Sequence, residues 1–128
     1  MRRLAILLLF GNLASSSGAL AQSPEAGERV FAQCRVCHQV GETARNAVGP
    51  HLNGLFSRTS GSIEGYSYTD ANKTAGIQWD EASFREYITD PKAKIPGTKM
   101  IFAGLKNPSQ IADLIAYLKQ FDAAGKKP

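Results

Sequence analysis

The sequence predicts a single all-α domain built from short helices and long loops. With 128 residues, of which 43% are hydrophobic, the chain has enough apolar material for one compact core. Apolar residues recur at helical spacing in several segments, loops rich in glycine and proline separate these segments, and no stretch shows the clear alternation typical of a strand. Because such loops bury few contacts of their own, we expect an enclosed apolar group to complete the core.

Residues 1–21 are typical of a cleavable secretory signal, which leaves residues 22–128 as the domain. Two arginines precede an apolar run at 4–10, and 19–21 has the small-x-small pattern that a signal peptidase accepts. The alternative is a retained membrane anchor, but this run is far shorter than the ~20 residues that span a bilayer. We therefore expect cleavage after residue 21, no membrane span in the mature chain and, in a Gram-negative bacterium, a periplasmic location.

The charge pattern argues against a nucleic-acid partner. The formal net charge of +4 comes from 15 basic and 11 acidic residues, and the signal segment carries two of the arginines. The remaining basic residues are scattered along the chain, apart from Lys126-Lys127 at its end. No basic face is therefore predicted.

We expect the mature domain to be a monomer.

The first and second helices are predicted from their end signals. Ser23 followed by a proline is a favourable start, because its hydroxyl can cap the helix and proline suits the first helical position. This predicts a helix over 24–33. A shorter helix over 69–75 has Thr69 as its cap and Gly76 as its end, since glycine readily adopts the left-handed conformation.

Two further helices are predicted from capping residues and apolar spacing together. One follows Asp80, and a stronger one opens at Asn107-Pro108. The apolar faces carry Phe84, Tyr87 and Ile88 in the first case, and Ile111, Leu114, Ile115 and Leu118 in the second.

The run Cys34-Arg35-Val36-Cys37-His38 is typical of covalent attachment of a c-type haem. The two thiols can add across the haem vinyl groups, and the short spacer lets both reach one edge of the porphyrin. His38 follows directly, so its imidazole can turn under the ring and bind the iron. We therefore expect one covalent haem c.

Three other interpretations of Cys34 and Cys37 compete with haem. A thioredoxin-like redox pair requires a βαβ context that is absent, and zinc requires four ligands whereas only His51 remains as a nitrogen donor. A structural disulfide would leave His38 without a role and the loops without a core. The haem interpretation accounts for all of these features.

Met100 is the predicted second axial ligand. It is the only methionine after the signal segment, and it follows a Pro96-Gly97 turn that can shape its loop. The rival is His51, which would give a bis-histidine iron of lower potential, and an open site is the third alternative. An iron closed by His38 and Met100 has no vacant position, which favours electron transfer over catalysis.

Several stretches together resemble class I cytochrome c, the family of mitochondrial cytochrome c and its short bacterial periplasmic relatives. They are 34–38, 49–50, 65–73, 95–102 and 113–118. The resemblance covers nearly all of the mature chain. It implies the class I cytochrome c fold, with helices and long loops wrapped around one covalent haem, and a soluble periplasmic single-electron carrier rather than an enzyme.

The resemblance also implies roles for individual residues. His38 and Met100 would ligate the iron, and the Pro50 carbonyl would orient the His38 ring. The haem propionates would be held by Arg58, Tyr68 and Trp79. The polar network near Met100 would be formed by Asn72, Tyr87 and Thr98. Helix packing around the haem would involve Gly27, Phe31, Leu114 and Tyr117. Ordinary core packing is the alternative for Trp79 and Tyr87.

The partners implied by the resemblance are redox proteins of a respiratory or photosynthetic chain, such as a quinol–cytochrome c reductase and a terminal oxidase, reductase or photosynthetic reaction centre. The family usually surrounds its haem edge with lysines, and here that ring is thinned by Glu28, Gln33, Ala47, Ala93 and Asn107. The cations that remain are Arg45, Lys92, Lys99 and Lys106. We therefore expect docking to acidic surfaces with moderate electrostatic steering.

Two other functions stay open at this point. A haem enzyme or gas sensor would need a displaceable sixth ligand and a distal pocket. A tightly held subunit of a dehydrogenase or oxidase would move electrons without diffusing between complexes.

Overall fold

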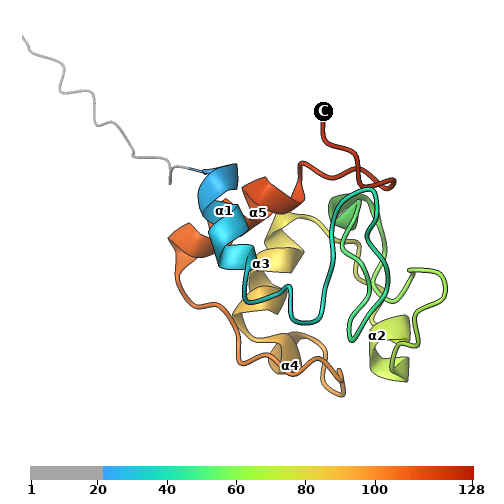
Figure 1. Cartoon of the computed structure of the whole chain (residues 1–128). Coiled ribbons are helices and arrows are strands. Elements are labelled where there is room, and N and C mark those ends of the chain that lie inside the picture. Colours follow the sequence, from blue (N-terminus) through green and yellow to red (C-terminus); the bar gives the residue numbers. More distant parts are fainter. Residues whose placement is uncertain (1–21) are drawn as a thin grey trace, which may run out of the picture.

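The structure, a computed structural model, describes residues 22–128 as an all-α arrangement of short helices joined by long loops (Figure 1). Its elements are α1 (Pro24–Phe31), the 3₁₀ helix η1 (Leu55–Ser57), α2 (Asp70–Thr74), α3 (Glu81–Thr89), α4 (Pro91–Lys94) and α5 (Pro108–Leu118). The β-structure described over this range is one isolated bridge, between Thr59 and Gln78. The predicted signal segment, residues 1–21, lies outside the described residues.

Each helix that was predicted from a capping residue begins directly after that residue. The Ser23 hydroxyl accepts a hydrogen bond from the Ala26 N–H at 3.1 Å. The other starts are capped in the same way, by Thr69 in α2, Asp80 in α3 and Asn107 in α5. These side chains satisfy N–H groups that the first helical turn leaves without a partner.

Two details of the predicted secondary structure are wrong. Helix α1 ends at Phe31 rather than residue 33, because the chain continues as tight turns in which the Cys34 N–H donates to the Phe31 carbonyl at 2.8 Å. Helix α4 was not predicted, since four residues are too few to show periodicity. Its start, Asp90-Pro91, has the same cap-and-proline pattern that predicted α1.

The main helical contact is between α1 and α5, which lie side by side at one end of the molecule (Figure 1). The rings of Phe31 and Tyr117 have centroids 5.3 Å apart. The Ser23 N–H also donates to the Asp113 carboxylate at 2.9 Å, which ties the start of α1 to α5. Helix α3 contacts both α4 and α5, so the three longest helices form one support for the loops.

Gly27 allows the close approach of α1 and α5. A Cβ atom on this residue would lie 1.9 Å from the Asp113 carbonyl oxygen and 2.7 Å from the Tyr117 Cβ. Because one of these neighbours is backbone, a side chain at this position can be accommodated only by separating the helices. None of the helices in the described part of the chain is long and apolar enough to cross a membrane.

We predict that Gly27→Ala destabilises the haem-loaded protein by about 2–3 kcal/mol, the upper part of the usual cost of overpacking. In an exposed helix, replacing glycine by alanine would instead stabilise the protein by up to about 1 kcal/mol. A loss of unfolding free energy at this position therefore indicates close packing. Guanidinium unfolding measures the free energy. Arg29→Ala, on the exposed side of α1, is the control and should change it by no more than about 0.5 kcal/mol. Equal values for the two variants would contradict the close-packing argument.

Candidate functional site

A cavity of about 470 Å³ lies between the helices and the loops, and every residue predicted for the site lines it. These residues are Cys34, Cys37, His38, Pro50, Arg58, Tyr68, Asn72, Trp79, Tyr87, Thr98 and Met100. Apolar side chains from three helices and η1 complete its wall, namely Phe31, Leu55, Phe84, Ile88, Leu114 and Leu118. Such a volume and lining are typical of a cofactor or ligand site.

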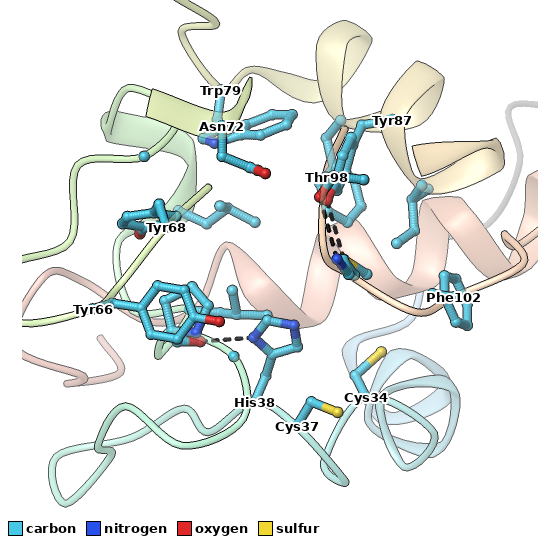
Figure 2. Close-up of a pocket in the computed structure, with 18 of the residues that line it drawn as sticks. Cys34, Cys37, His38, Tyr66, Tyr68, Asn72, Trp79, Tyr87, Thr98 and Phe102 are labelled. Atoms are coloured by element: carbon cyan, nitrogen blue, oxygen red, sulfur yellow. Dashed lines mark hydrogen bonds between the residues drawn. The ribbon is translucent and has the colours of Figure 1, made fainter. Parts of the chain in front are cut away.

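His38 is held in one orientation at one wall of this cavity (Figure 2). Its Nδ1 lies 2.7 Å from the Pro50 carbonyl oxygen. Because a carbonyl only accepts, Nδ1 carries the proton and donates it, which leaves the lone pair on Nε2. Burial is the main cause that lowers the pKa of His38, and the charge of Arg58 acts in the same direction. The neutral imidazole is the form that ligates a metal.

Gly49 gives the His38 ring its space. A Cβ at this position would lie 2.3 Å from the ring's Cε1 and 2.7 Å from Nδ1. The neighbouring backbone is bound as well, since the Gly49 N–H donates to the Cys37 carbonyl at 2.8 Å. The Gly49-Pro50 pair therefore positions the imidazole by contact on one side and by a hydrogen bond on the other.

Cys34 and Cys37 lie in a helical turn that continues from α1, and their side chains extend toward the cavity beside His38 (Figure 2). The N–H groups of Cys37 and His38 both donate to the Cys34 carbonyl, at 3.0 and 2.9 Å. The two sulfurs are not joined in a disulfide. Burial, with a smaller contribution from Cys37, raises the pKa of Cys34 to about 11.

These properties argue against the competing interpretations of the two cysteines. A redox-active pair depends on a lowered thiol pKa, whereas that of Cys34 is raised. Within residues 22–128, no three His, Cys, Asp or Glu side chains come together as a metal site. His51 does not line the cavity. Its Nδ1 accepts the Asn53 N–H at 3.3 Å instead.

The facing wall presents the sulfur of Met100. The Tyr87 hydroxyl donates to this sulfur at 3.1 Å, and the Met100 N–H donates to the Thr98 hydroxyl at 3.3 Å. Burial raises the pKa of Tyr87, while Thr98 and Asn72 act in the opposite direction, so at neutral pH the phenol keeps the proton that it donates. Asn72 lines the same wall, but its amide oxygen accepts a hydrogen bond from Thr69 at 2.9 Å.

Arg58 brings a positive charge to the cavity wall without an acidic partner. Its guanidinium donates to the carbonyls of His51 and Asn53, at 3.0 and 3.2 Å, and no carboxylate in residues 22–128 lies within ion-pair distance. Burial lowers its pKa. A partly desolvated cation of this kind is stabilised by an anion, and haem propionates would supply one.

Tyr68 and Trp79 also lie on this side of the cavity (Figure 2). The Tyr68 hydroxyl accepts the Ile63 N–H at 3.2 Å, and burial raises its pKa. The ring of Trp79 packs against that of Tyr87, with centroids 5.0 Å apart. Trp79 therefore contributes to the core as well as to the cavity wall.

Sequence reasoning assigned no role to several residues that line the cavity. They include Val48, Gly49, Leu52, Thr59, Tyr66, Ile101 and Phe102. Most lie in loops without periodicity, so nothing in their spacing marks them as buried or exposed. The signals available were the family-like stretches 49–50, 65–73 and 95–102, which contain four of them.

The donor set fits a covalent haem protein of the electron-transfer class. Two cysteine side chains and a neutral, oriented imidazole line the cavity together with a thioether sulfur and a guanidinium that has no carboxylate partner in residues 22–128. Residues 24–122 match the family Cytochrome c. The chain belongs to this family and has the all-α class I cytochrome c fold. It carries one covalently attached haem c and is an electron-transfer protein rather than an enzyme.

Individual relatives agree with this assignment. The chain is 61% identical to cytochrome c2 of Blastochloris viridis over 127 residues, which covers 99% of both proteins. It is 58% identical to cytochrome c-550 of Nitrobacter winogradskyi over 102 residues, covering 80% of this chain and 94% of that protein. Among solved structures, cytochrome cH from Methylobacterium extorquens has a TM-score of 0.71 and 43% identity, and covers 76% of this chain and 97% of its own.

We predict that Gly49→Ala displaces the His38 ring and destabilises the haem-loaded protein by about 2 kcal/mol. Gly65→Ala is the control. It adds the same methyl group, but at Gly65, where φ is +76°, this methyl would lie 3.8 Å from the nearest atom, on Asn46. Unfolding followed by haem absorption measures stability, and the high-spin fraction of the ferric spectrum reports on the imidazole. Only Gly49→Ala should raise that fraction. The same spectrum in both variants would contradict a role for Gly49 in holding the ring.

Proposed function

We propose that the protein is a soluble, exported single-electron carrier whose haem iron is ligated by His38 and Met100. The observation that carries the proposal is that an oriented imidazole and a thioether sulfur line the same largely apolar cavity. Thioether bonds from Cys34 and Cys37 would fix the haem beside His38. When bound, the haem supplies an iron that exchanges one electron between its ferrous and ferric states.

The protein's own contribution is to hold both ligands still. The Pro50 carbonyl and Gly49 restrict the His38 ring, and the Tyr87 hydroxyl restricts the Met100 sulfur from the other side. A shell that changes little between oxidation states lowers the cost of electron transfer. The hydrogen bond to the sulfur also withdraws electron density from it, which favours the ferrous state.

Arg58, Tyr68 and Trp79 would serve the haem propionates. Arg58 has an unmatched positive charge at the cavity wall, and propionate carboxylates would neutralise it. A lone cation near the haem would raise the reduction potential of the iron. Because the propionate carboxylates offset the charge of Arg58, the pair would raise this potential less than Arg58 alone. Asn72 and Thr98 would complete the polar surroundings of Met100.

The proposal includes export of the protein and electron exchange with redox partners. Residues 1–21 would be removed as a signal peptide, so that the mature domain, residues 22–128, acts in the periplasm. As a monomer it would pass electrons between membrane-bound or soluble redox complexes of a respiratory or photosynthetic chain. The intact mass of the purified protein tests the cleavage after Ala21, and the size of the native particle distinguishes a free carrier from a tightly held subunit.

We predict that Met100→Ala abolishes the sulfur-to-iron charge-transfer band of the ferric protein and produces a high-spin spectrum. The reduction potential should fall on the order of 0.1–0.3 V, within the roughly 0.8 V that axial ligands control. A redox titration with spectra measures both effects. His51→Ala is the control, and it should leave the band and the potential unchanged. Loss of the band in the His51 variant instead would contradict Met100 ligation.

We also predict a moderate dependence of the electron-transfer rate on ionic strength. The four cations expected near the haem edge are all exposed, but two of them are tied to backbone carbonyls, Lys99 to that of Ser67 and Lys106 to that of Thr89. With an acidic redox partner, the rate should fall by up to about tenfold between low and physiological salt. Lys92→Gln should weaken this dependence more than Lys126→Gln at the chain end. A flat dependence would contradict electrostatic steering.

A further inference from the structure

We propose that Tyr66 and Lys99 form a clasp that restrains the loop carrying Met100 and so controls how readily its sulfur leaves the iron. The proposal rests on Met100 acting as an axial ligand. The clasp is defined by the Tyr66 ring, the Lys99 ammonium and the carbonyls of Ser67 and Val48. In this scheme Tyr66 and Lys99 are positioning residues.

The contacts of the clasp join three loops. The Lys99 Nζ lies 4.7 Å from the centroid of the Tyr66 ring and donates a hydrogen bond to the Ser67 carbonyl. The Tyr66 hydroxyl donates to the Val48 carbonyl at 2.7 Å. The loop of Met100 is therefore linked through Tyr66 to the segment next to Gly49, which positions His38.

Tyr66 is itself well held. Its ring meets that of Tyr68 edge to face, with centroids 4.8 Å apart and planes at 75°. The backbone just before it is bound by Asn46, whose amide donates to the Glu64 carbonyl at 3.1 Å. Figure 2 shows the Tyr66 ring at the border of the cavity, on the same side as His38. A cation on this ring thus has a fixed support rather than a mobile one.

The loop of Met100 has few other attachments. Between residues 98 and 104, the hydrogen bonds to other segments of the described chain involve Lys99, which donates to Ser67, and Tyr87, whose hydroxyl contacts the Met100 sulfur and the Thr98 side chain. Ile101, the next residue, is 96% exposed. When the sulfur moves away, its bond to Tyr87 is lost with it, so the Lys99 contacts oppose wider opening of the loop, together with the packing of Phe102 against the core.

The charge of Lys99 has no acidic partner that would compete with the ring. No carboxylate in residues 22–128 lies within ion-pair distance of its ammonium. A cation over an aromatic face is attracted by the ring, and at exposed sites this attraction corresponds to a two- to fivefold change in an equilibrium. The hydrogen bond to Ser67 adds to it. We therefore expect an effect of about fivefold on opening of the loop.

The test is the binding of imidazole to the ferric, haem-loaded protein at pH 7. Imidazole can reach the iron only when Met100 has left, so at saturating imidazole the rate reports opening of the loop. Lys99→Ala should raise this limiting rate about fivefold, and Tyr66→Leu, which keeps the hydrogen bond to Ser67, should raise it about two- to threefold. Lys99→Arg keeps the cation and should stay near the wild-type rate. Lys126→Ala removes an exposed surface charge at the chain end and should have no effect.

The double variant Tyr66→Leu/Lys99→Ala tests whether the two residues act together. If they form a clasp, its rate should match that of Lys99→Ala, because this single variant already removes both the contact with the Tyr66 ring and the hydrogen bond to Ser67. Rates that multiply, or single variants that behave as wild type, would overturn the proposal. If Tyr66→Leu fails to fold, as judged by circular dichroism, the comparison of Lys99→Ala with Lys99→Arg decides the outcome in the same way.

Failure of the clasp and failure of Met100 ligation give different results. If the wild-type ferric protein has a sulfur-to-iron band that imidazole abolishes, Met100 ligation stands, and unaltered variant rates refute the clasp alone. If the wild-type protein has no such band, the ligand assignment is wrong and the clasp proposal falls with it.

Discussion

Enclosure of one large apolar cavity by a chain with little helix is the constraint on which this structure depends. The helices supply a firm support where α1 and α5 meet at Gly27, and the remaining wall is made from loops. Loops alone bury too little surface to offset their ordering entropy. The covalent haem is therefore part of the core, which explains how a domain with helices of 4 to 11 residues can be stable.

The two sides of the cavity are held to different degrees. On the side of His38, the ring is fixed by the Pro50 carbonyl and by contact with Gly49, and the backbone of this segment is hydrogen-bonded. On the side of Met100, the loop is attached by the hydrogen bonds of Tyr87 and Lys99 and by the packing of Phe102 against the core. A rigid shell suits electron transfer. The asymmetry indicates where ligand exchange would begin.

The cations around the cavity differ mainly in their burial. Arg58 and Lys99 both line the cavity without a carboxylate partner among the described residues, and both donate to backbone carbonyls. Arg58 is half-buried, which fits internal neutralisation of the haem, whereas Lys99 and Lys106 are exposed at the surface.

The sequence by itself determined the starts of α1, α2, α3 and α5 and the haem motif, because caps, apolar spacing and the Cys34 to His38 run are local signals. The resemblance to class I cytochrome c added further residues that line the cavity. The sequence could not determine the short helix α4, the steric role of Gly49 or the contact of Lys99 with Tyr66. The two contacts join residues distant in the chain, and loops have no period from which such neighbours could be inferred. Only the tertiary structure decides them, since the cavity brings the loops together.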